Sequence, residues 1–194
     1  MKKHLLLSLL IIAGYKGVAV AEPSSNASEW YVGENLITPY SQLYSSWIPH
    51  VKPGENERSK MWQHPEKGFS DSFVVTIRNG YQVDLKEFRN IQDAPGHSSC
   101  KPFTSVILKT PRINDFDSLL WVTNCKTTNN KQASIVHMAI QGKDSFYHIQ
   151  KIWKYKANGK EMKKWWDQIS MTYICDTRDP KKLCPAGFKK IKDL

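Results

Sequence analysis

The sequence predicts an α+β protein in which an antiparallel β-sheet is flanked by helices, as an α/β/α sandwich held by two disulfides. Three observations lead to this fold class. The middle of the chain contains successive runs of β-forming residues separated by turn sequences. Two segments place apolar residues at helical spacing behind a capping residue. Four cysteines, an even number, follow an N-terminal segment of the kind that directs export.

Residues 1–21 have the three parts of a secretory signal peptide. A basic start at Lys2 and Lys3 precedes an apolar run over residues 5–13, and a small-x-small pattern ends at Ala21. The apolar run is about half as long as a helix that crosses a bilayer. We expect cleavage after Ala21, which leaves a mature chain with no transmembrane segment. This chain would consist of a flexible leader over residues 22–35 and a single α+β domain over residues 36–194.

The N-terminal part of the domain is expected to contain a helix, a loop and a strand. Thr38 can cap a short amphipathic helix that Pro49 stops. Residues 50–70 are polar and contain proline and glycine, which is typical of a loop. Residues 73–77 form a β-rich run that ends at the turn sequence Asn79–Gly80.

A brief helix is expected next, followed by most of the sheet. Asp84 lies three residues before Glu87, the spacing of a capping box, and the sequence Pro95–Gly96 is expected to end this helix. The β-rich runs that follow predict antiparallel strands over residues 104–108, 119–124, 134–141 and 145–155. We place a two-residue turn, Gly142–Lys143, between the last two strands.

The C-terminal third contains the clearest helical pattern. Asn158 and Glu161 have capping-box spacing. Apolar residues then fall in a stripe about 100° wide, formed by Met162, Trp165, Trp166, Ile169 and Tyr173. Adjacent tryptophans on one face can bury a large apolar area against a sheet. The pattern therefore predicts a long helix that ends near Cys175.

The four cysteines are expected to form two disulfides, because an exported chain folds in an oxidising compartment. Three pairings are possible, and we favour those between sequence neighbours, Cys100 with Cys125 and Cys175 with Cys184. Zinc binding is the competing interpretation. It is disfavoured because the spacings lack the C-x-x-C pattern that zinc modules use.

The positive charge of the mature chain is confined to one end. The whole sequence carries +10, and removal of Lys2, Lys3 and Lys16 with the signal leaves +7. Residues 22–150 hold 13 basic and 13 acidic side chains, whereas residues 151–194 hold 12 and 5. A basic region attracts anionic polymers or lipid headgroups, although solubility alone can also account for it. No nucleic-acid partner is expected outside the cytoplasm. The candidate contact residues are Lys160, Lys163, Lys164, Arg178, Lys181 and Lys182.

A histidine pair is the candidate for metal binding. With Gly142–Lys143 as a hairpin turn, His137 would lie directly opposite His148 on one face of the sheet. Paired imidazoles can bind a metal ion or change their charge near neutral pH. The pattern supplies no third ligand, and a half-exposed polar pair is the alternative. No cofactor is predicted.

Catalysis has little support among the residues. There is no G-x-S-x-G motif, and disulfide formation would remove the thiol nucleophiles. Ser98 and Ser99 are only sequence neighbours of His97, which seldom produces catalytic geometry. Two alternatives to a binding protein stay open: a secreted hydrolase with an unrecognised active site, for which His137 and His148 are candidates, and a small periplasmic metal-binding protein.

The order of the expected elements resembles the PsbP/Mog1-like fold, in which helices flank an antiparallel sheet. Residues 142–147 (GKDSFY) and 175–178 (CDTR) also resemble segments of small uncharacterised exported proteins from gammaproteobacterial pathogens. Some of those are type II secretion substrates. The resemblance covers residues 69–184 and transfers no functional residue. It implies an exported, non-catalytic and virulence-associated protein of a Gram-negative bacterium, periplasmic or secreted, that recognises a protein, an anionic glycan or a lipid surface.

Overall fold

The computed structural model describes residues 32–38, 46–108 and 114–185. Its main element is a seven-stranded antiparallel sheet in the order β2-β3-β4-β8-β7-β6-β5. The sheet consists of β2 (Ile48–Lys52), β3 (Glu57–His64), β4 (Gly68–Asn79), β5 (Cys100–Leu108), β6 (Asp117–Thr127), β7 (Gln132–Gln141) and β8 (Ser145–Trp153). A separate two-stranded sheet pairs β1 (Glu34–Ile37) with β9 (Tyr173–Asp176), and the helices are α1 (Leu85–Ser99) and α2 (Gly159–Ile169).

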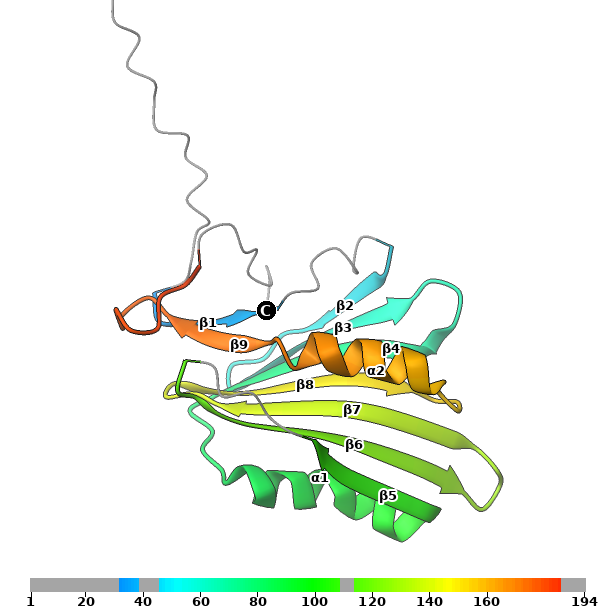
Figure 1. The fold of residues 1–194 in the computed structure, drawn as a ribbon. Coiled ribbons are helices and arrows are strands. Elements are labelled where there is room, and N and C mark those ends of the chain that lie inside the picture. The colour runs from blue at the N-terminus through cyan, green and yellow to red at the C-terminus, as the bar shows by residue number, and fades with distance from the viewer. Residues whose placement is uncertain (1–31, 39–45, 109–113, 186–194) are drawn as a thin grey trace, which may run out of the picture.

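Each face of the large sheet is partly covered (Figure 1). On one face lies α1, whose Phe88 packs with Trp121 and Phe146. On the other face lie α2 and the β1–β9 sheet, where Phe73 stacks on Trp165. An α+β fold is therefore confirmed. The predicted α/β/α sandwich is not confirmed, because the sheet dominates and a single helix covers only part of each face.

The polar segment over residues 50–70, predicted as a loop, is mainly strand. It contains most of β2 and all of β3, and β4 begins at Gly68, five residues before the predicted run. All residues of β2 are exposed, because this strand lies at the edge of the sheet. Backbone hydrogen bonds to one neighbour hold such a strand, so the hydrophobic pattern does not reveal it.

The chain enters the fold earlier than predicted. The first strand begins at Glu34, so the last two residues of the expected leader belong to β1. They form a strand because β1 pairs along its whole length with β9, far away in the sequence. The helix expected after Thr38 falls largely on residues 39–45, which lie outside the described residues.

The first helix, α1, is longer than predicted. Asp84 caps it as expected, accepting hydrogen bonds from two backbone N–H groups of the first turn. The helix then continues through Pro95 and Gly96. A Cβ added to Gly96 would come within 2.2 Å of a ring carbon of Phe103. Close packing against the Phe103 ring therefore requires glycine at this position, and the residue does not form the predicted turn.

The second helix, α2, is shorter than predicted. Asn158 caps it as expected, but it ends at Ile169, and Tyr173 begins β9. The apolar stripe continues across this boundary because both elements face the same core. Trp165 is buried in that core, whereas Trp166 is only partly buried.

Two disulfides join Cys100 to Cys125 and Cys175 to Cys184, which is the pairing between sequence neighbours. The first connects the start of β5 with β6, and the second closes a loop that follows β9. In the described part of the chain, no helix has the length and apolar character needed to cross a bilayer. The predicted signal peptide, residues 1–21, lies outside the described residues.

Candidate interaction surface

The structure brings His137 and His148 together, although the predicted register is wrong. The β7–β8 turn lies one residue later than predicted, at Lys143–Asp144. His137 therefore lies opposite Gln150 and not opposite His148. The shift moves the partner of His137 by two positions along β8, from His148 to Gln150. A shift of two positions keeps side chains on the same face of a sheet, so both imidazoles lie on the face covered by α1, as diagonal neighbours.

The two imidazoles are parts of a buried hydrogen-bonded network. Nδ1 of His137 lies 3.3 Å from Nε2 of His148, and Nε2 of His137 lies 3.2 Å from the hydroxyl of Thr123. The His137 ring stacks on Trp121 with 4.4 Å between centroids. Burial, and then the neighbouring His148, hold the pKa of His137 well below its ordinary value. Burial, and then the charge of Arg78, lower the pKa of His148 to about 3.

The burial of the pair limits its use as a metal site or as a catalytic site. His137 and His148 are only 3% and 4% exposed, so neither touches bulk solvent to any useful extent. Among the described residues, no three side chains of metal-ligating type come together. The pair is thus a hydrogen-bonded, almost wholly buried element of the core beneath α1, with no third ligand among the described residues.

The loop closed by the Cys175–Cys184 disulfide holds Arg178 in an internal ion-pair network. Its guanidinium lies 2.8 Å from a carboxylate oxygen of Asp176 and 2.5 Å from one of Asp144 in the β7–β8 turn. Hydrogen bonds from Arg178 lower the pKa of Asp176 to about 2. Arg178, a predicted contact residue, is therefore engaged in intramolecular ion pairs, although its side chain is 46% exposed.

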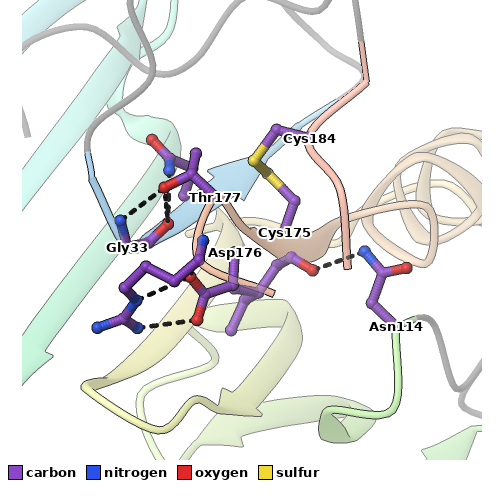
Figure 2. The surroundings of a disulfide bond; sticks show 9 residues. Gly33, Asn114, Cys175, Asp176, Thr177 and Cys184 are labelled. Carbon is purple, nitrogen blue, oxygen red and sulfur yellow. Dashed lines mark hydrogen bonds and ion pairs between the residues drawn. A yellow bond between two sulfur atoms is a disulfide. The ribbon is translucent and has the colours of Figure 1, made fainter. Parts of the chain in front are cut away.

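Hydrogen bonds connect β1 and the residue before it to the same region (Figure 2). The backbone N–H of Gly33 donates to Oγ1 of Thr177 at 2.8 Å. The Glu34 carboxylate accepts hydrogen bonds from three successive backbone N–H groups of the β7–β8 turn. A Cβ on Gly142 would lie 2.4 Å from that carboxylate. These contacts stabilise the turn at Lys143–Asp144 and account for the observed register.

The other two predicted contact residues of this loop differ in exposure. Lys181 is exposed. Lys182 is half-buried, with its Nζ 4.2 Å from the centroid of the Phe116 ring. A cation over an aromatic face stabilises the loop locally, so Lys181 alone of the two is fully available to a partner.

The three predicted contact lysines of α2 face solvent. Lys160, Lys163 and Lys164 are all exposed, and helical geometry places them within an arc of about 100° on the side away from the buried Trp165. Lys163 pairs with Asp167 at 2.6 Å. In the part of the chain that the structure describes, Lys160 and Lys164 make no ion pair.

The basic surface extends beyond the predicted residues. Two further exposed lysines lie in the connection from β8 to α2. The acidic Glu161 between them and the helix face is engaged, since it accepts a hydrogen bond from the Trp153 indole at 3.1 Å. We call the resulting surface the α2 lysine strip; it consists of Lys154, Lys156, Lys160, Lys163 and Lys164.

Lys151, just before the strip, is wholly buried between β8 and α2. It forms an ion pair with Asp71. Its Nζ lies 4.5–5.0 Å from the ring centroids of three tryptophans, Trp47, Trp153 and Trp165. Burial lowers the pKa of Lys151 to about 8, although the bond to Asp71 opposes this.

The sequence contained a signal for this buried pair. Lys151 alternates with Ile149 and Trp153 along β8, and alternate residues of a strand share a face. The pattern therefore placed a lysine in an apolar row, which indicates a buried cation that needs a partner. The identity of that partner, Asp71, depends on the pairing of β4 with β8 and could not be read locally.

Comparison with known proteins adds no further constraint. Neither a protein-family model nor a curated protein sequence matches this chain.

Proposed function

We propose that this protein is exported and binds an acidic polysaccharide, without catalysis, through the α2 lysine strip. The observation that carries the proposal is the concentration of five exposed lysines over residues 154–164, of which Lys163 alone is ion-paired among the described residues. Exposed charges of one sign on one face attract a polyanion. A lysine without an internal partner can bind an anionic group without first breaking another contact.

The composition of the strip favours a polysaccharide over a lipid surface. A helix that lies on a membrane inserts its apolar face into the headgroup region. The apolar face of α2 is already packed on the sheet through Trp165 and Ile169. None of its large apolar side chains in the described structure is exposed. The helix therefore offers charge to a partner, and no insertion surface.

The same composition favours a polysaccharide over a protein partner. The centres of protein–protein interfaces are enriched in aromatic residues and arginine and depleted in lysine. The strip is rich in lysine, and of its aromatic neighbours Trp153 and Trp165 are buried, while Tyr155 and Trp166 are only partly exposed. Flexible lysines suit a ligand that repeats an anionic group along its length.

The disulfides support the exported location within this proposal, because such bonds persist in oxidising compartments. We propose cleavage after Ala21 and a periplasmic or extracellular destination, as the resemblance to exported proteins of Gram-negative bacteria implies. Intact-mass measurement of the native product tests this. A chain that begins at Glu22 with all four cysteines oxidised is expected, and a full-length chain or free thiols would contradict it.

Heparin, as a model acidic polysaccharide, tests the binding proposal. The test compares the mature protein with a Lys160→Ser/Lys164→Ser variant and with a Lys52→Ser/Lys86→Ser control, which removes the same charge from exposed positions on β2 and α1. The strip variant is expected to bind on the order of tenfold more weakly, at about 0.7 kcal/mol for each of the two lost charged contacts. Equal losses in both variants, or no binding by the mature protein, would overturn the proposal.

A further inference from the structure

A hollow of about 300 Å³ lies beside the α2 lysine strip. Strands β5, β6 and β7 form most of it, near the Cys100–Cys125 disulfide, and Lys156 of the strip closes it on the α2 side. We propose that this hollow is a subsite for one anionic pyranose unit of the polysaccharide. The inference rests on the proposed function and deepens it, since it assigns a specific site to one unit of the polymer.

Two lysines supply the charge of the subsite. Lys126 of β6 and Lys156 both line the hollow, and none of the described residues that line it is acidic. Neither lysine makes an ion pair among the described residues. A sulfate, phosphate or carboxylate group placed between them would therefore meet two cations and no opposing carboxylate.

The hollow also contains an ordered set of hydrogen-bonding groups. Ser134 Oγ donates to Oδ1 of Asn124 at 2.8 Å, and Nδ2 of Asn124 donates to Oγ1 of Thr104 at 3.4 Å. These bonds fix the orientation of the Asn124 carboxamide. They use one of its two N–H hydrogens and leave the Thr104 hydroxyl hydrogen to donate elsewhere. Both remaining donors can bind hydroxyl groups of a sugar ring.

The size and the apolar part of the hollow match a single sugar unit. Its volume is at the lower end of the range for ligand sites, so it can hold one or two rings and not a folded chain. Pro102 lines it beside the polar groups. Cys125 and Ala133 also border it, but their side chains project to the α1 face, because each lies one position along its strand from Asn124 or Ser134. The C–H face of a pyranose can pack on the proline ring, while its edge makes the hydrogen bonds.

The hollow adjoins the strip, so a bound polymer would run from one to the other. Lys156 belongs to both surfaces, and Asn158, the N-cap of α2, follows it by two residues. A chain with one unit in the hollow would therefore continue past Lys156 toward Lys160 and Lys164. The hollow would fix the register of the polymer, and the strip would bind the units that follow.

Short oligosaccharides separate the hollow from the strip. Calorimetric titration uses a trisulfated heparin disaccharide and, separately, a digalacturonate, because a sulfated and a uronic unit carry the anionic group differently. The mature protein is compared with Lys126→Ser/Lys156→Ser and with a Lys131→Ser/Lys52→Ser control, which removes equal charge from exposed positions outside the hollow. Thr104→Phe fills the hollow from its own face without a change of charge, since Thr104 is exposed and its hydroxyl contacts Asn124.

At least one disaccharide is expected to bind, and which of them binds identifies the anionic group. The Lys126→Ser/Lys156→Ser variant is expected to bind on the order of tenfold more weakly, whereas the control stays within about twofold. Thr104→Phe should abolish disaccharide binding and leave most of the affinity for long heparin; if this variant does not fold, the lysine pair decides. Failure of both disaccharides to bind, or an equal loss in the control, would overturn the inference.

The outcomes also distinguish this inference from the proposed function. Long heparin that binds through Lys160 and Lys164, with no disaccharide binding, would overturn the subsite and leave the strip. Loss of both kinds of binding would overturn both. Disaccharide binding that persists in Thr104→Phe would place the ligand outside the hollow and also overturn the subsite.

Discussion

Lowering the pH from 7 to 5 is expected to destabilise this protein through the neutral histidines beneath α1. Burial depresses the pKa of His148 to about 3 and also lowers that of His137. In the unfolded chain both imidazoles have an ordinary pKa of about 6.5. Between these values the unfolded state binds protons that the folded state does not, so stability falls as the pH falls.

The structure gives the magnitude for one of the two groups. At pH 5, which is about 1.5 units below the unfolded pKa, a histidine that stays neutral in the fold contributes a loss of about 2 kcal/mol. His148 fits this case because its side chain is 4% exposed and packs against the ring of Phe88. The positive charge of Arg78 also disfavours protonation of the imidazole. His137 acts in the same direction. The loss is large against a typical unfolding free energy of about 5–15 kcal/mol.

Urea unfolding at several pH values between 5 and 7 measures this effect. The His148→Gln variant should lose about 2 kcal/mol less than the wild type over this range, whatever its stability at pH 7. His97→Gln, which removes an exposed imidazole at the end of α1, serves as the control and should keep the wild-type slope. An unchanged slope in His148→Gln, or a His148 imidazole that titrates near pH 6.5 in the folded state, would refute the reasoning.

Two further predictions concern buried and covalent contacts. Asp71→Asn should destabilise the fold by about 3–5 kcal/mol, because it leaves the Lys151 charge buried without a counter-ion. The double variant Asp71→Leu/Lys151→Met removes both charges and should be far less harmful. Equal stabilities of the two variants in urea unfolding would contradict this prediction. Replacement of Cys175 and Cys184 by serine should lower stability by about 2–3 kcal/mol and raise hydrogen exchange first in β9 and β1, whereas uniform loss of protection would contradict a local role.

Elements with strong local signals were predictable from the sequence. Asn158 and Asp84 cap the two helices as their spacing indicated, and the β-rich runs became β4 to β8. The disulfide pairing followed from the expected export and from the order of the cysteines in the sequence, which are 25 and 9 positions apart. The helix caps depend on contacts within three residues, and each β-rich run carries its own local strand signal.

Elements that depend on distant partners were not predictable. The edge strand β2 is held by backbone pairing to β3 and lacks an apolar pattern. The end of the expected long helix became β9 because β1 pairs with it. The turn at Lys143–Asp144 depends on the Glu34 carboxylate, which comes from the other end of the described chain.

The candidate surface was predictable only in part. The polar face of α2 follows from helical spacing, so Lys160, Lys163 and Lys164 were correctly placed in solvent. Arg178 has the same charge, but one of its two carboxylate partners, Asp144, lies 34 residues away, so the ion-pair network could not be read locally. The hollow near Lys156 needs three paired strands to exist, and no local pattern indicates it.

The most direct test of the account maps where an acidic polysaccharide touches the protein. Amide chemical shifts of the mature chain are followed by NMR during titration with a heparin hexasaccharide. The account predicts that the largest changes fall on residues 154–164 and on the strands that line the hollow, around Asn124 and Thr104. Changes centred on α1, on β2 or on the Cys175–Cys184 loop would contradict it.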